Sequence, residues 1–162
     1  MLALLLLIAA QRPTDPTIHD AKLFAHDKLD NVQTRMRLIS FYSRYLSDLI
    51  RNASDRETER ELRREQDIHV STSKGIYCHL EVVVDPQTSE SQKVSALRWL
   101  ERHLGAEAFQ RGEVPPPYNA KREKEFKAWL KKQIEDVPEQ AKGLEELIKR
   151  DDESQKKPAE KK

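Results

Sequence analysis

Two histidine–aspartate pairs, His19-Asp20 and His26-Asp27, are the residues that most readily suggest acid–base or metal chemistry. Their spacing of seven residues corresponds to two helical turns, which would separate the two imidazoles by about 10 Å along one helix face. Direct chelation of one metal ion on a helix instead requires ligands at positions i and i+4. We therefore expect these four residues to be polar groups that face solvent.

The single cysteine, Cys78, stands next to His79. Side chains of adjacent residues diverge on a helix or a strand, so His79 is poorly placed to activate the Cys78 thiol. One cysteine can form neither an internal disulfide nor a cysteine-based zinc cluster. We expect a buried core thiol, and we predict no catalytic residue, no metal site and no cofactor. A small metal-dependent or hydrolytic enzyme that uses the His and Asp residues, with His69, His79 and His103 brought together in space, is the least favoured alternative.

The charge balance disfavours nucleic acid as a partner. The chain has 29 Lys and Arg residues against 28 Asp and Glu residues, a net charge of +1, so it creates no general basic field. The charged stretch 55–67, DRETERELRREQD, mixes both signs and is typical of a solvated helix. Only four glycines are present, which argues against glycine-rich phosphate-binding loops.

Partner binding is the chemistry that the sequence favours, and one predicted helix, Ala120 to Val137, carries its candidate residues. Phe126 and Trp129 lie on the apolar face, and Lys127 and Lys131 belong to a locally basic face. That helix could bind a protein partner or lie on an anionic membrane surface. The alternative that we prefer is intramolecular packing against the helix that ends at Leu104, which carries the second tryptophan, Trp99.

An uninterrupted apolar run, Leu2–Ala10, precedes the polar residues Gln11 and Arg12. Nine helical residues span about 14 Å, roughly half of the hydrocarbon core of a bilayer. The run therefore resembles the apolar region of a secretory signal more than a transmembrane helix. We expect a secreted or periplasmic protein; a cytoplasmic protein in which residues 1–10 form a packed helix is the alternative.

Apolar spacing predicts that most of the chain is helical. The strongest stripe begins at Leu29 and advances by steps of three and four residues, as on one face of a long helix. A second helix should run from about Ser89 to Leu104, followed by Gly105 as a terminating residue. The predicted stripe consists of Leu29, Val32, Met36, Ile39, Tyr42, Leu46 and Leu49.

The segment 68–84 is ambiguous. Apolar residues alternate in IYCHLEVVV, residues 76–84, and their β-branched content favours a strand. With Ile68 and Val70 before a Ser73-Lys74-Gly75 turn, the segment could form a short β-hairpin. The same residues also fit a helical face, which agrees with the helices predicted on either side.

The stretch Leu80–Leu104 resembles a HEAT-type repeat, in which two antiparallel helices are joined by an Asp-Pro turn. Ser95 stands where the repeat usually has a basic residue, and no second clear copy follows at the repeat interval. The resemblance implies a protein-binding scaffold rather than an enzyme. The residues that carry it are Val82, Val83, Val84, Asp85, Pro86, Val94, Ala96, Leu97 and Leu100.

Together these features predict an all-α protein, a small helical bundle or a HEAT-like helical array, with a possible β-hairpin near 68–84. The helical domain should span residues 17–150. Residues 151–162 contain eight charged residues and no large apolar residue, so we expect a disordered, dispensable tail. The predicted function is a non-enzymatic interaction module, exported or membrane-proximal; the alternative is a helical subunit of a larger cytosolic or organellar assembly.

Overall fold

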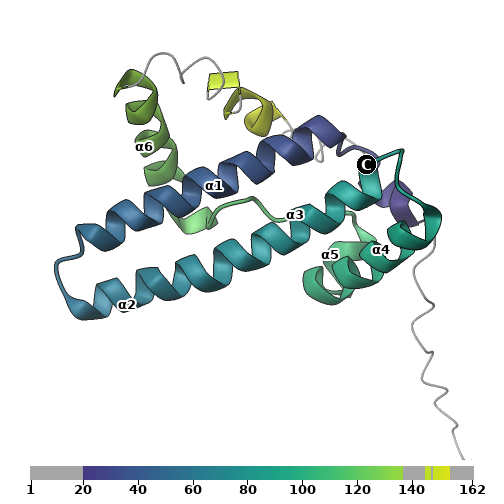
Figure 1. The fold of residues 1–162 in the computed structure, drawn as a ribbon, viewed down its shortest axis with the longest axis horizontal. Coiled ribbons are helices and arrows are strands. Elements are labelled where there is room, and N and C mark those ends of the chain that lie inside the picture. Colours follow the sequence, from purple (N-terminus) through teal and green to yellow (C-terminus); the bar gives the residue numbers. More distant parts are fainter. Residues whose placement is uncertain (1–19, 137–144, 147, 154–162) are drawn as a thin grey trace, which may run out of the picture.

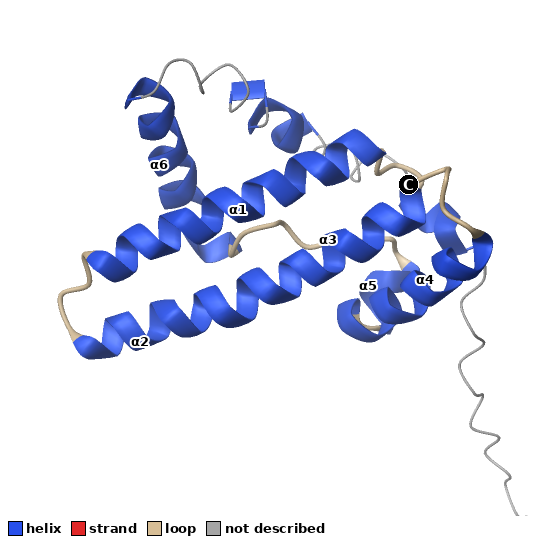
Figure 2. Ribbon diagram, viewed as in Figure 1, coloured by secondary structure: helices blue, strands red, loops and turns tan. Residues whose placement is uncertain are grey.

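The computed structural model describes residues 20–136, 145–146 and 148–153, and every regular element in these ranges is helical (Figure 2). The predicted all-α fold is therefore confirmed. The predicted signal-like segment 1–10 and His19 lie outside the described residues. The elements are a 3₁₀ turn Asp20–Phe24, α1 Leu29–Arg51, α2 Arg56–Glu65, a π-helical turn Gln66–Val70, α3 Ser71–Val84, α4 Glu90–Leu104, α5 Ala106–Gln110, a 3₁₀ turn Ala120–Arg122 and α6 Glu123–Asp136.

The central element is α1, which packs against α2, α3 and α6. The predicted stripe is buried in its middle, at Val32, Ile39, Tyr42 and Leu46, while its ends at Leu29 and Leu49 are only half-buried. Additional residues are buried because α1 has neighbours on more than one side. They are Thr34, Arg35, Leu38 and Tyr45.

The possible β-hairpin at 68–84 is wrong. Helix α2, the π-helical turn and α3 follow one another without a break and run back along α1 (Figure 1). Residues Ile76, Leu80 and Val83 are spaced by four and three, so a helix buries all of them on one face. A strand would bury only alternate residues, and tertiary packing on α1 and α4 outweighs the local β propensity here.

Helix α4 starts and ends at the predicted residues. The backbone N–H of Ser89 donates to Gln92 Oε1 at 3.2 Å, which is half of a capping box. Gly105 ends the helix with φ +85°, a backbone conformation that favours glycine. Helix α4 packs on α3 after the turn at Asp85, and α5 follows it at the same end of the molecule (Figure 1).

Two apolar clusters form the core on either end of α1. The first joins the N-terminal half of α1 to α3, α4 and α5, with Phe24, Leu80, Leu97 and Leu100 fully buried. The second joins the C-terminal half of α1 to Leu62, Tyr118, Phe126 and Leu130. Because α6 belongs to the second cluster, it lies across α1 from the α3–α4 pair (Figure 1).

Candidate functional site

Aromatic side chains fix α6 to α1. Phe126 is fully buried, and its ring centroid lies 5.1 Å from that of Tyr42, 5.6 Å from Tyr45 and 5.3 Å from Tyr118. These separations are typical of packed aromatic pairs in a protein core. Phe126, a predicted partner-binding residue, is therefore a core residue and is not available to a partner on the surface.

Trp129 is half-buried and faces α1. Its indole Nε1 donates to Asp48 Oδ2 at 3.1 Å, and its ring centroid lies 5.8 Å from that of Tyr45. The expected packing of this helix against Trp99 is wrong. Trp99 instead stacks between His79 at 4.0 Å and His103 at 3.6 Å, on the other side of the molecule.

Lys127 is paired with carboxylates of the same chain. Its Nζ lies 2.7 Å from Glu123 Oε1 and 2.7 Å from Asp152 Oδ1. Burial alone would lower the pKa of the Lys127 ammonium, but the hydrogen bonds to Asp152 and Glu123 outweigh burial and raise that pKa. Lys127 therefore links α6 to the C-terminal helical residues. Of the four predicted residues, only Lys131 remains exposed at a surface hollow.

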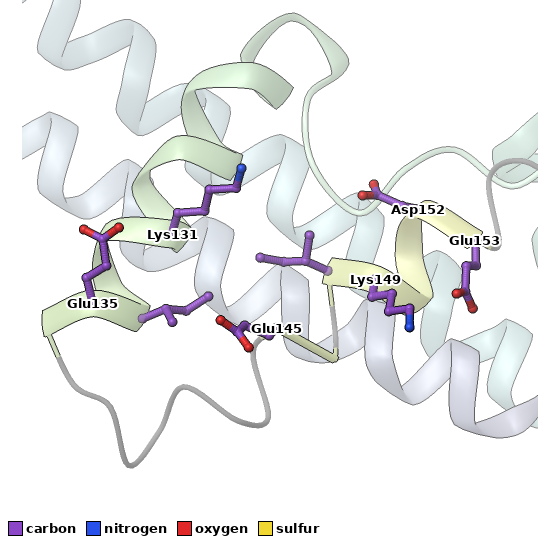
Figure 3. A pocket seen from close by; sticks show the side chains of 8 residues that line it. Lys131, Glu135, Glu145, Lys149, Asp152 and Glu153 are labelled. Carbon is purple, nitrogen blue, oxygen red and sulfur yellow. The ribbon is translucent and has the colours of Figure 1, made fainter.

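Lys131 lies on the wall of a cleft of about 550 Å³ between α6 and the C-terminal helical residues (Figure 3). Ile134 and Ile148 supply its apolar lining. Figure 3 shows charged side chains on the two helical segments that border the cleft. They are Lys131, Glu135, Glu145, Lys149, Asp152 and Glu153.

The charges around the cleft are mostly uncompensated. Four of the lining residues are carboxylates and two are lysines. Asp152 is bound to Lys127, whereas Glu135, Glu145 and Glu153 form no ion pair within the described residues. The cleft therefore combines an apolar centre with a rim in which three carboxylates, unpaired among the described residues, outnumber two lysines, and such a rim is complementary to an amphipathic ligand with a basic face.

A buried carboxylate anchors the C-terminal side of the cleft. Asp151 is 2% exposed, and its Oδ2 accepts a hydrogen bond from the Tyr118 hydroxyl at 3.1 Å. Its Oδ1 lies 4.0 Å from Arg35 Nε on α1. Residues 151–153 are helical, so the folded part of the chain continues beyond the predicted boundary at residue 150. The remainder of the predicted tail, 154–162, lies outside the described residues.

The two residues of the second histidine–aspartate pair, His26 and Asp27, have different environments. His26 is half-exposed, but Asp27 is 2% exposed and binds Arg35 Nη1 at 2.7 Å, so the solvent-facing prediction is wrong for Asp27. The hydrogen bond to Asp27 raises the pKa of His26 against the opposing effect of burial. Cys78 is half-buried. Among the described residues, no group of three or more His, Cys, Asp or Glu side chains is arranged to hold a metal ion.

Sequence reasoning found Lys131 but missed the rest of the cleft. Glu145, Ile148, Lys149 and Glu153 lie close to the predicted boundary between domain and tail, where the density of charge suggested a solvated segment. The available signal was Ile148, an aliphatic residue just before the charged run. The position of Ile148 predicts that one side of this segment is buried. It does not predict which element that side packs against.

No family model matches the chain, and no curated protein or solved structure shows significant similarity to it. The resemblance of residues 80–104 to a HEAT-type repeat therefore stays a prediction. Within the part of the chain that the structure describes, no helix is long and apolar enough to cross a membrane.

Proposed function

We propose that the protein is a non-enzymatic helical interaction module that holds a segment of a partner protein in the cleft between α6 and residues 145–153. The observation that carries the proposal is the combination of an apolar lining, Ile134 and Ile148, with an acid-rich rim whose carboxylates are largely unpaired. Such a rim selects by charge, and an apolar centre supplies affinity when water is excluded from it.

The chemistry of the cleft defines the partner segment. An aliphatic side chain would cover Ile134 and Ile148, and basic side chains would approach Glu135 and Glu145. A basic amphipathic helix presents both kinds of side chain at a spacing of three or four residues. We therefore expect the partner to contribute a helical segment of this type.

The basic face predicted on α6 contributes less to binding than its sequence suggests. Arg122 belongs to the predicted helix Ala120 to Val137 and lies in the 3₁₀ turn that precedes α6; its Nε binds Glu65 Oε2 at 2.8 Å. Lys127 is held by Glu123 and Asp152. Two of its cations are therefore compensated within the protein, which weakens the case for an anionic membrane as the ligand. The composition of the cleft therefore favours a protein partner as the ligand.

The compartment is part of the proposal. We propose that residues 2–10 act as a secretory signal, so that the module works outside the cytoplasm or close to a membrane. Mass spectrometry of the protein from its natural source should find a mature N-terminus close to Gln11. A retained segment 2–10 would favour the alternative, a subunit of a cytosolic or organellar assembly.

A peptide titration tests the cleft. The probe is a short peptide with leucines on one face of a helix, spaced by three and four residues, and lysines on the opposite face. The matched control replaces each lysine with glutamate. We expect the lysine peptide to shift the backbone amide NMR signals of Lys131, Ile134, Glu145 and Ile148 in a saturable manner. Equal shifts with both peptides, or shifts confined to other residues, would contradict the proposal.

A further inference from the structure

A second hollow lies between α1 and the π-helical turn, and it shares no lining residue with the cleft. Its volume of about 460 Å³ is in the range of small-molecule binding sites, roughly 300–1,000 Å³. We call it the α1 groove. It is lined by Met36, Arg37, Ile39, Ser40, Ser43, Val70 and Lys74.

The π-helical turn Gln66–Val70 forms one end of the α1 groove. It is the junction between α2 and α3, and Gln66 fastens it to α1 by donating to the Ser43 carbonyl at 2.9 Å and to Ser47 Oγ at 2.8 Å. A π-helical turn is wider than an α-helical one, so it rotates the following side chains around the helix. Such turns recur at functional sites, and here Val70 is part of the lining.

The two cations of the α1 groove come from two facing helices, α1 and α3. Because α1 and α3 run in opposite directions, Ser43 lies beside Gln66, while Arg35 lies over the ring of Tyr77 at 5.9 Å. Arg37 from α1 and Lys74 from α3 both line the groove. Both are exposed, and neither forms an ion pair or a hydrogen bond with another described residue.

Two uncompensated cations on facing helices repel each other, and an anion between them removes that repulsion. The groove also provides hydroxyl groups at Ser40 and Ser43, and the Ser40 hydroxyl has no partner among the described residues. Met36 and Val70 are half-buried and Ile39 is buried, so they present apolar surface beneath these polar groups. The α1 groove thus has a cationic region and an apolar floor.

We propose that the α1 groove binds a small amphiphilic anion. Its oxyanion head, a carboxylate or a phosphate monoester, lies between Arg37 and Lys74, and its short aliphatic body covers Met36 and Val70. Arginine is suited to this role because its planar guanidinium can donate two parallel hydrogen bonds to one oxyanion. This site is independent of the cleft and of the function proposed for it.

Three probes test the chemistry of the ligand: hexanoate, hexyl phosphate and hexan-1-ol. We expect saturable shifts of the amide NMR signals of Arg37, Ser40, Ser43 and Lys74 with at least one of the two anions. The anion that binds more tightly identifies the head group. Hexan-1-ol should bind at least about tenfold more weakly, since it lacks the charge. Equal affinity for hexan-1-ol, or no saturable shift with either anion, would overturn the proposal.

A matched pair of double variants separates the site from general charge effects. Arg37→Gln with Lys74→Gln should weaken binding of the anion by at least about tenfold. Arg102→Gln with Lys121→Gln removes two exposed cations elsewhere and should leave the affinity unchanged. Because all four residues are exposed, both double variants should fold, and circular dichroism checks this. Equal weakening by both double variants would overturn the proposal, as would unchanged affinity in the first.

Discussion

Gly75 on α3 lies directly against the indole of Trp99 on α4. A Cβ atom at Gly75 would stand 2.8 Å from Trp99 Cη2 and 3.1 Å from Cζ2, closer than side chains tolerate. The indole cannot move aside easily, because His79 and His103 stack on its two faces. A glycine within a helix therefore allows α3 and α4 to approach each other at this point.

We predict that Gly75→Ala destabilises the protein, although alanine is the better helix former by about 0.5–1 kcal/mol. Overpacking a tight contact costs about 1–3 kcal/mol, so the net loss in the free energy of unfolding should be about 1 kcal/mol. Urea denaturation of Gly75→Ala, Trp99→Leu and the double variant measures the coupling. If Gly75→Ala is more stable than the parent, the contact between α3 and Trp99 is not tight.

The C-terminal anchor gives a second prediction. Truncation after Arg150 removes Asp151, which accepts a hydrogen bond from the Tyr118 hydroxyl and lies 4.0 Å from Arg35. Because Arg35 keeps its bond to Asp27, we expect a cost of about 1–3 kcal/mol, the range for losing one partner of a buried hydrogen bond. Truncation after Glu153 should cost less than about 1 kcal/mol, because residues 154–162 contain no large apolar side chain. Thermal denaturation compares the two. Equal stability of both truncated proteins would show that Asp151 does not anchor the segment.

Glu65 predicts a specific pH dependence. Burial would raise the pKa of Glu65, but hydrogen bonds from Tyr42, Arg122 and Asn119 outweigh it and hold the pKa below its ordinary value of 4.5. The unfolded chain then binds a proton at higher pH than the folded protein does. The stabilisation by Glu65 is therefore complete above pH 4.5 and is lost as the pH falls through the folded-state pKa.

Glu65→Gln removes this ionisation. We expect the variant to be less stable than the parent at pH 7, and the difference should shrink as the pH falls below 4.5. The matched control is Glu61→Gln, at an exposed position of the same helix. Urea denaturation as a function of pH is the measurement. A stability difference that does not change with pH would show that the charge of Glu65 does not stabilise the folded protein.

Trp129 allows its packing to be separated from its hydrogen bond. Trp129→Phe keeps most of the aromatic contact with Tyr45 but loses the bond to Asp48, so it should cost about 1 kcal/mol. Trp129→Ala should cost about 2–3 kcal/mol, less than the range for a fully buried tryptophan, because Trp129 is only partly buried. An unchanged melting temperature in both variants would place Trp129 on a binding surface instead.

Sequence periodicity was sufficient to predict the helical class and the middle of α1, because Val32, Ile39, Tyr42 and Leu46 repeat at helical spacing. It could not decide segment 68–84, since residues such as Ile76 and Leu80 fit both a strand and a helix. The choice depends on tertiary contacts with α1 and α4. Gly75 was predicted as a turn residue, but its role is to make room for Trp99.

The candidate cleft was less accessible to prediction than the fold. Lys127 and Lys131 both read as exposed basic residues, yet only Lys131 is free, because Asp152 pairs with Lys127. That pair depends on how the C-terminal residues fold back, and local sequence does not encode it. Asp151 stands at the start of a charged run, so composition alone suggests a solvated residue although it is buried.

The most direct test of the proposed function measures the affinity of the leucine–lysine peptide by isothermal titration calorimetry. Glu135→Lys with Glu145→Lys reverses the charge of the cleft rim, and Glu61→Lys with Asp67→Lys makes the same change in charge at exposed positions elsewhere. We predict that the rim variant binds the peptide at least about tenfold more weakly than the parent, and that the control binds within about twofold of it. Equal affinity of the rim variant and the parent would contradict the assignment of partner binding to this cleft.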